Sequence, residues 1–239
     1  MRIYRLAVAA SLLLLLATLA VVAYWFWARA ALDDGIAQWR AEQIERGYDI
    51  TYEGPEFGGF PFALSVTFRN PQVTTPGNLT WRGPPVQGQA RLWDPFTIEL
   101  RFSGLHRLHL PEELKGKQAD VFAEDAKGRV VLQRNGRVES ATLDLDRLRL
   151  SGQGLEPVAL QRLTARLGPL RKGRDGALDE VDLVGEALFL ELPAGRGGPL
   201  GDSVARISID STLIGGIPQG KPEVALPRWR DSGGHWQFH

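Results

Sequence analysis

The sequence predicts a mainly β protein, with one N-terminal transmembrane helix and stalk followed by a strongly curved, mostly antiparallel sheet. Two observations carry this prediction. Residues 6–28 form an apolar run without a charge, and as a helix this run is about 35 Å long, enough to cross a hydrocarbon core of about 30 Å. From residue 48 onward, apolar side chains recur at every second position in many segments, which is the period of a strand with one apolar and one polar face.

The apolar run predicts an uncleaved membrane anchor. Tyr24, Trp25 and Trp27 lie at its C-terminal end, and aromatic rings of this kind favour the membrane interface. The alternative is a cleaved signal peptide, in which Arg2 and Arg5 would be the charged N-terminal region. The apolar region of a signal peptide is shorter, however, at about 7–15 residues. The very short start of the chain favours an N-terminus inside and a domain outside.

A helical stalk should follow the anchor. Leu32, Ile36 and Trp39 recur at i, i+4 and i+7, and Gly47 supplies a C-terminal stop. The expected organisation is therefore a cytoplasmic tip (1–5), a transmembrane anchor (6–28), a helical stalk (29–46) and a periplasmic β-rich domain (47–239).

Two apolar rows form the candidate contact surface for an apolar ligand. Every second residue is apolar in segments 60–68 and 96–102, so each row lies on one face of its strand. Gly59 and Pro61 are the structural motif at the start of the first row, because glycine permits a tight turn and proline extends the residue before it. The alternative is that these side chains simply fill a core. The contact residues are Phe60, Phe62, Leu64, Val66, Phe68, Phe96, Ile98, Leu100 and Phe102.

Two later segments change face. Leucines stand at positions 143 and 145 and then at 148 and 150, and Leu183 and Ala187 give way to leucines at 188, 190 and 192. One inserted residue reverses the faces of a strand, so a bulge or strong bend is expected in each. Such bends indicate a curled sheet.

Composition and motifs argue against several functions. Lys+Arg and Asp+Glu are equal at 28 each, and without a basic stripe nucleic-acid binding is not expected. There is no cysteine. His106 and His109 lie three residues apart, which places them on opposite faces of a strand. Asp144 and Asp146 share a face, as expected of a solvated strand. We find no catalytic motif, and we predict no enzyme activity, no metal site and no cofactor.

Several short motifs together resemble the bacterial domain of unknown function 2125 family, which is similar in architecture to the AsmA and TamB group of envelope proteins. The resemblance implies an inner-membrane anchor, a periplasmic groove-like β body and, for the AsmA group, a role in lipid homeostasis or passage. It brings no catalytic residues. The motifs are the short N-terminal tip, the anchor, Trp39 in the stalk, residues 59–62, residues 93–95, and Trp229 with Gly233 and Gly234.

The sequence and this resemblance together predict a non-enzymatic envelope protein that binds or passes lipid acyl chains along an apolar β-groove. The expected location is the bacterial inner membrane, with a single-pass anchor and the main domain in the periplasm. The alternative is a periplasmic scaffold or assembly factor that binds protein partners through its sheet. The domain is also expected to be C-terminally incomplete, because Trp236 and Phe238 begin a two-faced strand at the end of the sequence, where relatives continue.

Overall fold

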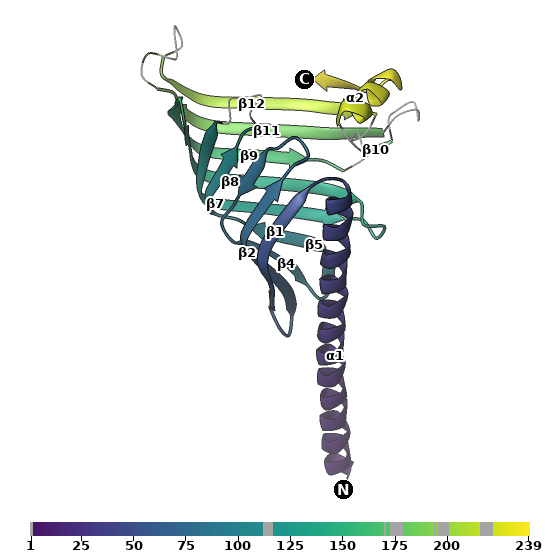
Figure 1. The fold of residues 1–239 in the computed structure, drawn as a ribbon. Coiled ribbons are helices and arrows are strands. Elements are labelled where there is room, and N and C mark those ends of the chain that lie inside the picture. Colours follow the sequence, from purple (N-terminus) through teal and green to yellow (C-terminus); the bar gives the residue numbers. More distant parts are fainter. Residues whose placement is uncertain are drawn as a thin grey trace.

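Helix α1 (Arg2–Glu45) leads into one large, curved antiparallel sheet (Figure 1). The computed structural model describes residues 2–111, 117–169, 171–172, 179–193, 195, 201–215 and 222–239. The expected mainly β fold with one N-terminal helix is confirmed. The strands are β1 (Asp49–Gly58), β2 (Ala63–Thr74), β3 (Thr80–Arg82), β4 (Val86–Arg91), β5 (Asp94–Arg101), β6 (Gly104–His109), β7 (Gln118–Leu132), β8 (Val138–Gly152), β9 (Leu155–Leu167), β10 (Arg171–Lys172), β11 (Asp179–Glu191), β12 (Ser203–Ile214) and β13 (His235–Phe238).

The anchor and the stalk are one continuous helix. It ends at Glu45, and Gly47 follows with a φ of 86°. The Gly47 amide donates to the Ile44 carbonyl and the Tyr48 amide donates to the Gln43 carbonyl. These two bonds define a Schellman cap, which places glycine in the left-handed conformation after the helix. The predicted C-terminal stop is therefore confirmed.

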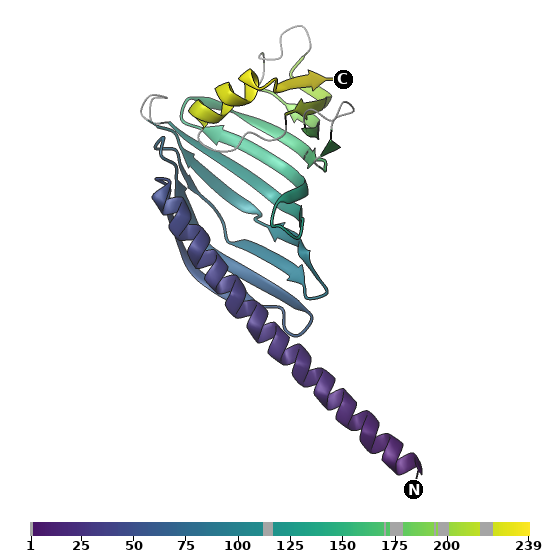
Figure 2. The same cartoon turned by 90° about the vertical axis from the view of Figure 1, so that its right-hand side faces the viewer.

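The C-terminal half of α1 runs along β1 at one edge of the sheet (Figure 2). The residues that face the sheet recur every three or four positions, which is the spacing of one helix face. An edge strand is thereby covered, and unpaired backbone groups there are shielded from other chains. These less exposed residues are Val22, Trp25, Ala28, Leu32, Ile36, Arg40 and Gln43. The predicted helical stalk is present, and Trp39, the third residue of its apolar spacing, is 50% exposed and lies outside this face.

The sheet is a simple meander. Residues 83–85 interrupt one long strand, which gives β3 and β4, and residues 102–103 interrupt the next, which gives β5 and β6. β3 pairs with β6, and β4 pairs with β5. From β7 on, the strands β8, β9, β11, β12 and β13 follow in sequence order. Each long strand therefore pairs with its neighbours in the chain.

A crease crosses the sheet at right angles to the strands. Asn70, Arg147 and Phe189 adopt φ values of 46°, 51° and 54° within β2, β8 and β11. In β8, the leucines are at odd-numbered positions up to Leu145 and at even-numbered positions from Leu148 on. The left-handed residue Arg147 lies between them, so the apolar side chains stay on one face of the strand. The predicted irregularities in segments 139–151 and 180–192 are confirmed.

The predicted bounds of some strands and helices were wrong. β2 begins at Ala63, and Phe60 and Phe62 lie in the turn before it, because this turn forms at Gly59, whose φ is 89°. Segment 111–127 has the charged composition of a loop, but β7 already begins within it at Gln118, and residues 112–116 lie outside the described residues. Helix α2 (Pro222–Asp231) was not expected.

The C-terminal end of the sheet carries α2 and then β13 (Figure 1). The Trp229 indole lies so close to Gly215 and Gly234 that an added Cβ would come within 2.7 and 2.3 Å of it. Both glycines are thus required by the packing of this ring. In the described part of the chain, β13 pairs with β12 alone, so β13 lies at an edge of the sheet.

Candidate functional site

One face of the sheet is apolar across eight strands. In the register of the strands, Val66 pairs with Gly88, Gly88 with Leu100, and so on to β12. Every residue in this row is apolar or glycine, because each strand alternates its faces and the strands are in register. We call it the central row, and it consists of Val66, Gly88, Leu100, Gly128, Leu143, Ala165, Gly185 and Ile209.

The neighbouring rows on this face have the same character. Together with the central row they form what we call the apolar face. Two residues further along each strand, the paired residues are Leu64, Ala90, Ile98, Val130, Ala141, Leu167, Leu183 and Ser211. Beyond the crease the face continues through Ala123, Leu148, Leu160, Leu190 and Val204.

The opposite face is polar along the same strands. The row next to the central row contains Thr67, Gln87, Arg101, Lys127, Asp144, Thr164, Glu186 and Ser208. Neighbouring charges on this face form ion pairs, such as Arg129 with Glu99 at 3.2 Å and Arg162 with Asp146 at 2.7 Å. We call this side the polar face.

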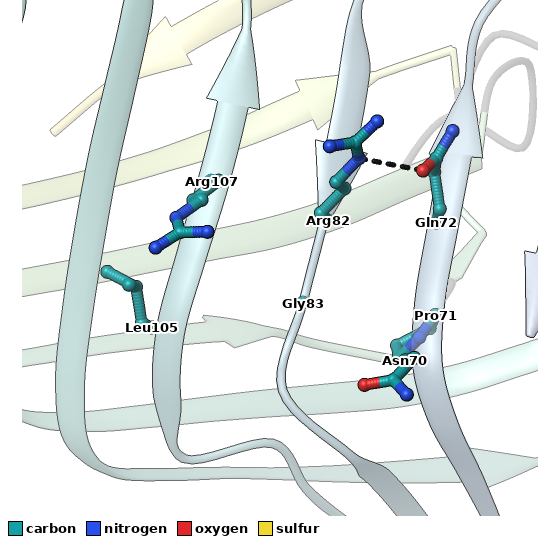
Figure 3. A pocket seen from close by; sticks show the side chains of 7 residues that line it. All are labelled: Asn70, Pro71, Gln72, Arg82, Gly83, Leu105 and Arg107. Carbon is teal, nitrogen blue, oxygen red and sulfur yellow. Dashed lines mark hydrogen bonds between the residues drawn. The ribbon is translucent and has the colours of Figure 1, made fainter.

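The polar face lies on the outside of the curve. Figure 3 looks onto Gln72, Arg82 and Arg107 in an open pocket on β2, β3 and β6, while later strands of the sheet cross behind these three. Arg82 donates from Nε to Gln72 Oε1 at 2.7 Å. The apolar face of β2, β3 and β6 is therefore turned toward the later strands, on the inner side of the sheet.

Within the part of the chain that the structure describes, no second layer of protein seals the apolar face. Among the described residues, only eight apolar residues are buried, and they lie mostly near α1 or in the crease. Leu100 and Leu143 in the central row are half-buried, and Ile209 is 50% exposed. A sheet face of this size usually packs against another layer, so the apolar face is a candidate binding surface.

The predicted contact residues divide into three groups. Leu64, Val66, Ile98 and Leu100 lie together on the apolar face. Phe68 packs on Tyr52, with ring centroids 4.8 Å apart, and Phe102 packs on His106 at 6.0 Å.

The third group lies at the ends of the strands. Phe96, near the start of β5, is 40% exposed. Phe60 and Phe62 are 53% and 64% exposed in the β1–β2 turn. The structure therefore does not bring these two into one row with Leu64.

Three glycines of the central row were missed by sequence reasoning. A Cβ built on Gly88 or Gly128 would lie 3.5 Å from the Leu100 side chain, which is ordinary van der Waals contact. The Leu100 side chain therefore packs over both glycines. The available signal was a glycine at an inward position of an alternating strand, which marks a close approach of another group.

His106 sits on the apolar face as a neutral side chain. Trp81 donates from Nε1 to His106 Nδ1 at 3.3 Å, so the ring proton is on Nε2, 2.9 Å from the Phe102 carbonyl oxygen to which it donates. Burial lowers the pKa of His106 below its ordinary value, and the bond to the Phe102 carbonyl opposes this effect. His109 is exposed, on the other face of β6, as the spacing of the two histidines predicted.

The comparisons with known proteins identify a family for this chain. The model of a family described as "Uncharacterized protein conserved in bacteria (DUF2125)" matches residues 25–239. Searches of the curated proteins and of the solved structures found no match.

Proposed function

The chain belongs to this bacterial DUF2125 family, and we propose that it is a non-enzymatic, membrane-anchored envelope protein that holds or passes lipid acyl chains along its apolar face. The observation that carries the proposal is the central row, which is apolar over eight strands and remains half-exposed. Each methylene group that leaves water for an apolar surface contributes about 0.8 kcal/mol. An acyl chain laid across the strands would gain this contribution along much of its length.

Helix α1 supports the membrane part of the proposal. It is long and apolar enough to cross a membrane, with a mean hydropathy of 2.4 in its most apolar window. We propose that it is an uncleaved anchor in the bacterial inner membrane and that the sheet lies in the periplasm. The similarity in architecture to the AsmA and TamB group is part of the same proposal, and a curved sheet with an apolar inner face supports it.

The polar face supports a role without catalysis. Its charged side chains pair with one another, as Arg147 does with Glu124 and Arg206 with Glu186. In the ranges that the structure describes, no group of three or more His, Cys, Asp or Glu side chains is arranged to hold a metal ion. We therefore propose no reaction for this protein.

Lipid binding is tested by extracting the full-length chain into a mild detergent and analysing it by native mass spectrometry. The expected result is co-purified phospholipid. Ile209→Asn should reduce the bound lipid severalfold, because it places an amide on the exposed part of the central row. Ser208→Asn is the matched control, since Ser208 is the exposed neighbour on the polar face. Equal lipid in both variants, or none in the unmodified protein, would exclude the proposed function.

A second candidate function has its own supporting observation. β13 forms the end of the sheet and carries Trp236 and Phe238, which are 48% and 68% exposed. Unpaired strand edges bind the strands of other proteins. A scaffold or assembly factor would therefore use this edge, and a stable protein that co-purifies with the chain and is lost on Trp236→Ser would support this candidate.

A further inference from the structure

We propose that the β1–β2 and β4–β5 turns form an aromatic tip that inserts into the interfacial layer of the bilayer spanned by α1. We define the aromatic tip as Phe60, Phe62 and Trp93. This inference rests on the membrane anchor of the proposed function but is independent of lipid binding by the sheet.

The three aromatic rings of the tip are exposed although they are large and apolar. Their exposed fractions are 53% for Phe60, 64% for Phe62 and 67% for Trp93. The two turns are tied together, because the Leu92 amide donates to the Phe62 carbonyl at 3.1 Å and the rings of Phe62 and Trp93 are 6.5 Å apart. A cluster of this kind marks a surface that binds a protein or a membrane.

The height of the tip along α1 identifies the membrane as its partner. Trp25 is about 29 Å along the helix from Leu6, at 1.5 Å per residue, and the hydrocarbon core is about 30 Å thick. Trp25 therefore lies close to the far boundary of the core. Phe60 packs edge-on against Trp25, with ring centroids 5.5 Å apart, so the tip lies at the same level.

The helix carries its own aromatic residues at this level. Tyr24, Phe26 and Trp27 are 42%, 56% and 65% exposed, and aromatic rings concentrate at membrane interfaces. The first charge beyond them is Arg29, whose guanidinium lies 5.2 Å from the Phe57 ring. The tip and the helix thus form one aromatic belt, which ends before Arg29 along α1.

The composition of the tip favours burial in lipid over an electrostatic attachment. No charged residue occurs between Glu56 and Arg69, and Arg91 and Asp94, on either side of the β4–β5 turn, carry opposite charges, so the tip has no net charge to bind phosphate groups. Its membrane contact should therefore depend little on salt, whereas a polybasic contact weakens as salt rises.

The position of the tip connects the bilayer to the apolar face. Leu64, the first apolar-face residue of β2, follows Phe62 by two positions, and Ile98 occupies the same row on β5. An inserted tip would therefore hold the start of this row at the membrane surface. Acyl chains would then move between the apolar face and the nearer leaflet of the bilayer that α1 spans, without crossing water.

The test is a depth measurement on the full-length protein in phosphatidylcholine–phosphatidylglycerol vesicles. Because the sequence has no cysteine, a single fluorophore can be attached through Phe62→Cys. Gly77→Cys is the control, since it lies in the turn that follows the far end of β2, where a Cβ meets only Thr75 Oγ1, at 3.9 Å. We expect brominated lipids to quench the label at position 62 at least threefold more strongly than at position 77, in low and high salt alike.

Two results would overturn the inference. In the first, aqueous iodide quenches both labels equally, which would place the tip in water. In the second, neither iodide nor brominated lipid reaches position 62, which would indicate a protein contact. The depth result stands whether or not lipid is found on the apolar face.

A second variant separates the tip from the proposed function. Phe62→Ser with Trp93→Ser should leave the circular dichroism spectrum unchanged, because both rings are mostly exposed. It should slow the loading of lipid from vesicles severalfold while leaving unchanged the amount bound from detergent micelles. Unchanged loading from vesicles would disprove the connecting role of the tip.

Discussion

The Trp25 indole donates a hydrogen bond from Nε1 to the Ala63 carbonyl oxygen at 2.8 Å, and both residues are buried. This bond joins the apolar helix to the first residue of β2. It therefore fixes the height of the sheet along α1, and it makes Trp25 structurally different from the neighbouring aromatic residues.

Trp25→Phe should lower the free energy of unfolding by about 1–2 kcal/mol, because it removes the donor and leaves a buried carbonyl without its partner. Trp27→Phe is the control, since Trp27 is 65% exposed, and it should change stability by less than about 0.5 kcal/mol. Urea unfolding of the full chain in detergent, followed by circular dichroism, measures both. Equal effects would mean that the contact between helix and sheet is not stabilising.

Leu143→Asp should destabilise the sheet by about 1–3 kcal/mol, because it places a carboxylate between Gly128 and Ala165 on the apolar face. Thr142→Asp is the matched control on the polar face, where the paired residues are Arg129 and Arg166. It should be neutral or slightly stabilising. The same urea titration compares them, and similar losses in both variants would contradict the assignment of the faces.

Arg147, which lies in the crease, should tolerate replacement by glycine. A left-handed conformation costs a non-glycine residue about 1–2 kcal/mol, and the exposed ion pair with Glu124 contributes at most about 1 kcal/mol. Arg147→Gly should therefore be neutral or stabilising in thermal unfolding. Arg147→Val should be destabilising, because a β-branched residue is poorly tolerated there.

The control for the crease is Arg149→Val, two residues further along β8 in extended backbone. Valine favours strands, so this change should cost nothing. A stable Arg147→Val protein would show that the strand does not keep the left-handed residue in solution.

His106 should make stability depend on pH. Its pKa is lowered in the folded protein by burial, so the unfolded chain binds the proton more readily, and stability rises with pH wherever this difference acts. The contribution of neutral His106 to the free energy of unfolding is therefore complete above the ordinary pKa of about 6.5. It is lost as pH falls through the lower pKa of the folded state. His106→Gln should flatten this dependence, whereas His109→Gln should not.

The measurement is the unfolding midpoint between pH 5 and pH 8, together with an NMR titration of the histidine ring protons. Asp125 does not complicate the result in this range. Its pKa is lowered chiefly by the hydrogen bond from Lys127, so its contribution is lost only at pH values below the ordinary range of a carboxyl group. An unshifted titration of His106 would contradict its assignment as a neutral, half-buried side chain.

Periodicity alone was enough to predict the curved sheet. The change of parity between positions 145 and 148 indicated a bend, because an alternating pattern can shift by one only where the backbone leaves the regular strand. The structure places Arg147 there in a left-handed conformation. The strand phases of Leu64, Val66, Ile98 and Leu100 were equally readable, since each lies inside a regular hairpin.

The rest of the site could not be predicted because it depends on contacts between distant segments. Phe60 and Phe62 continue the alternation of β2 in sequence, but Gly59 turns the chain and Trp25 packs against Phe60. Trp39 has helical spacing, yet the sheet covers the stripe that contains Ile36 and Arg40. α2 has no sustained apolar period, and its Trp229 is fixed by two glycines near it in space.

The order of the strands has a consequence for how the protein is made. Because the chain is synthesised from its N-terminus, α1 is made first, then β1 and β2, and then each later strand in turn. Every long strand from β7 on therefore reaches a partner that has already emerged, and each new pairing closes a short loop, which favours rapid folding. Assembly of the sheet can thus proceed strand by strand in sequence order, so that little unpaired apolar strand is exposed to aggregation at any moment.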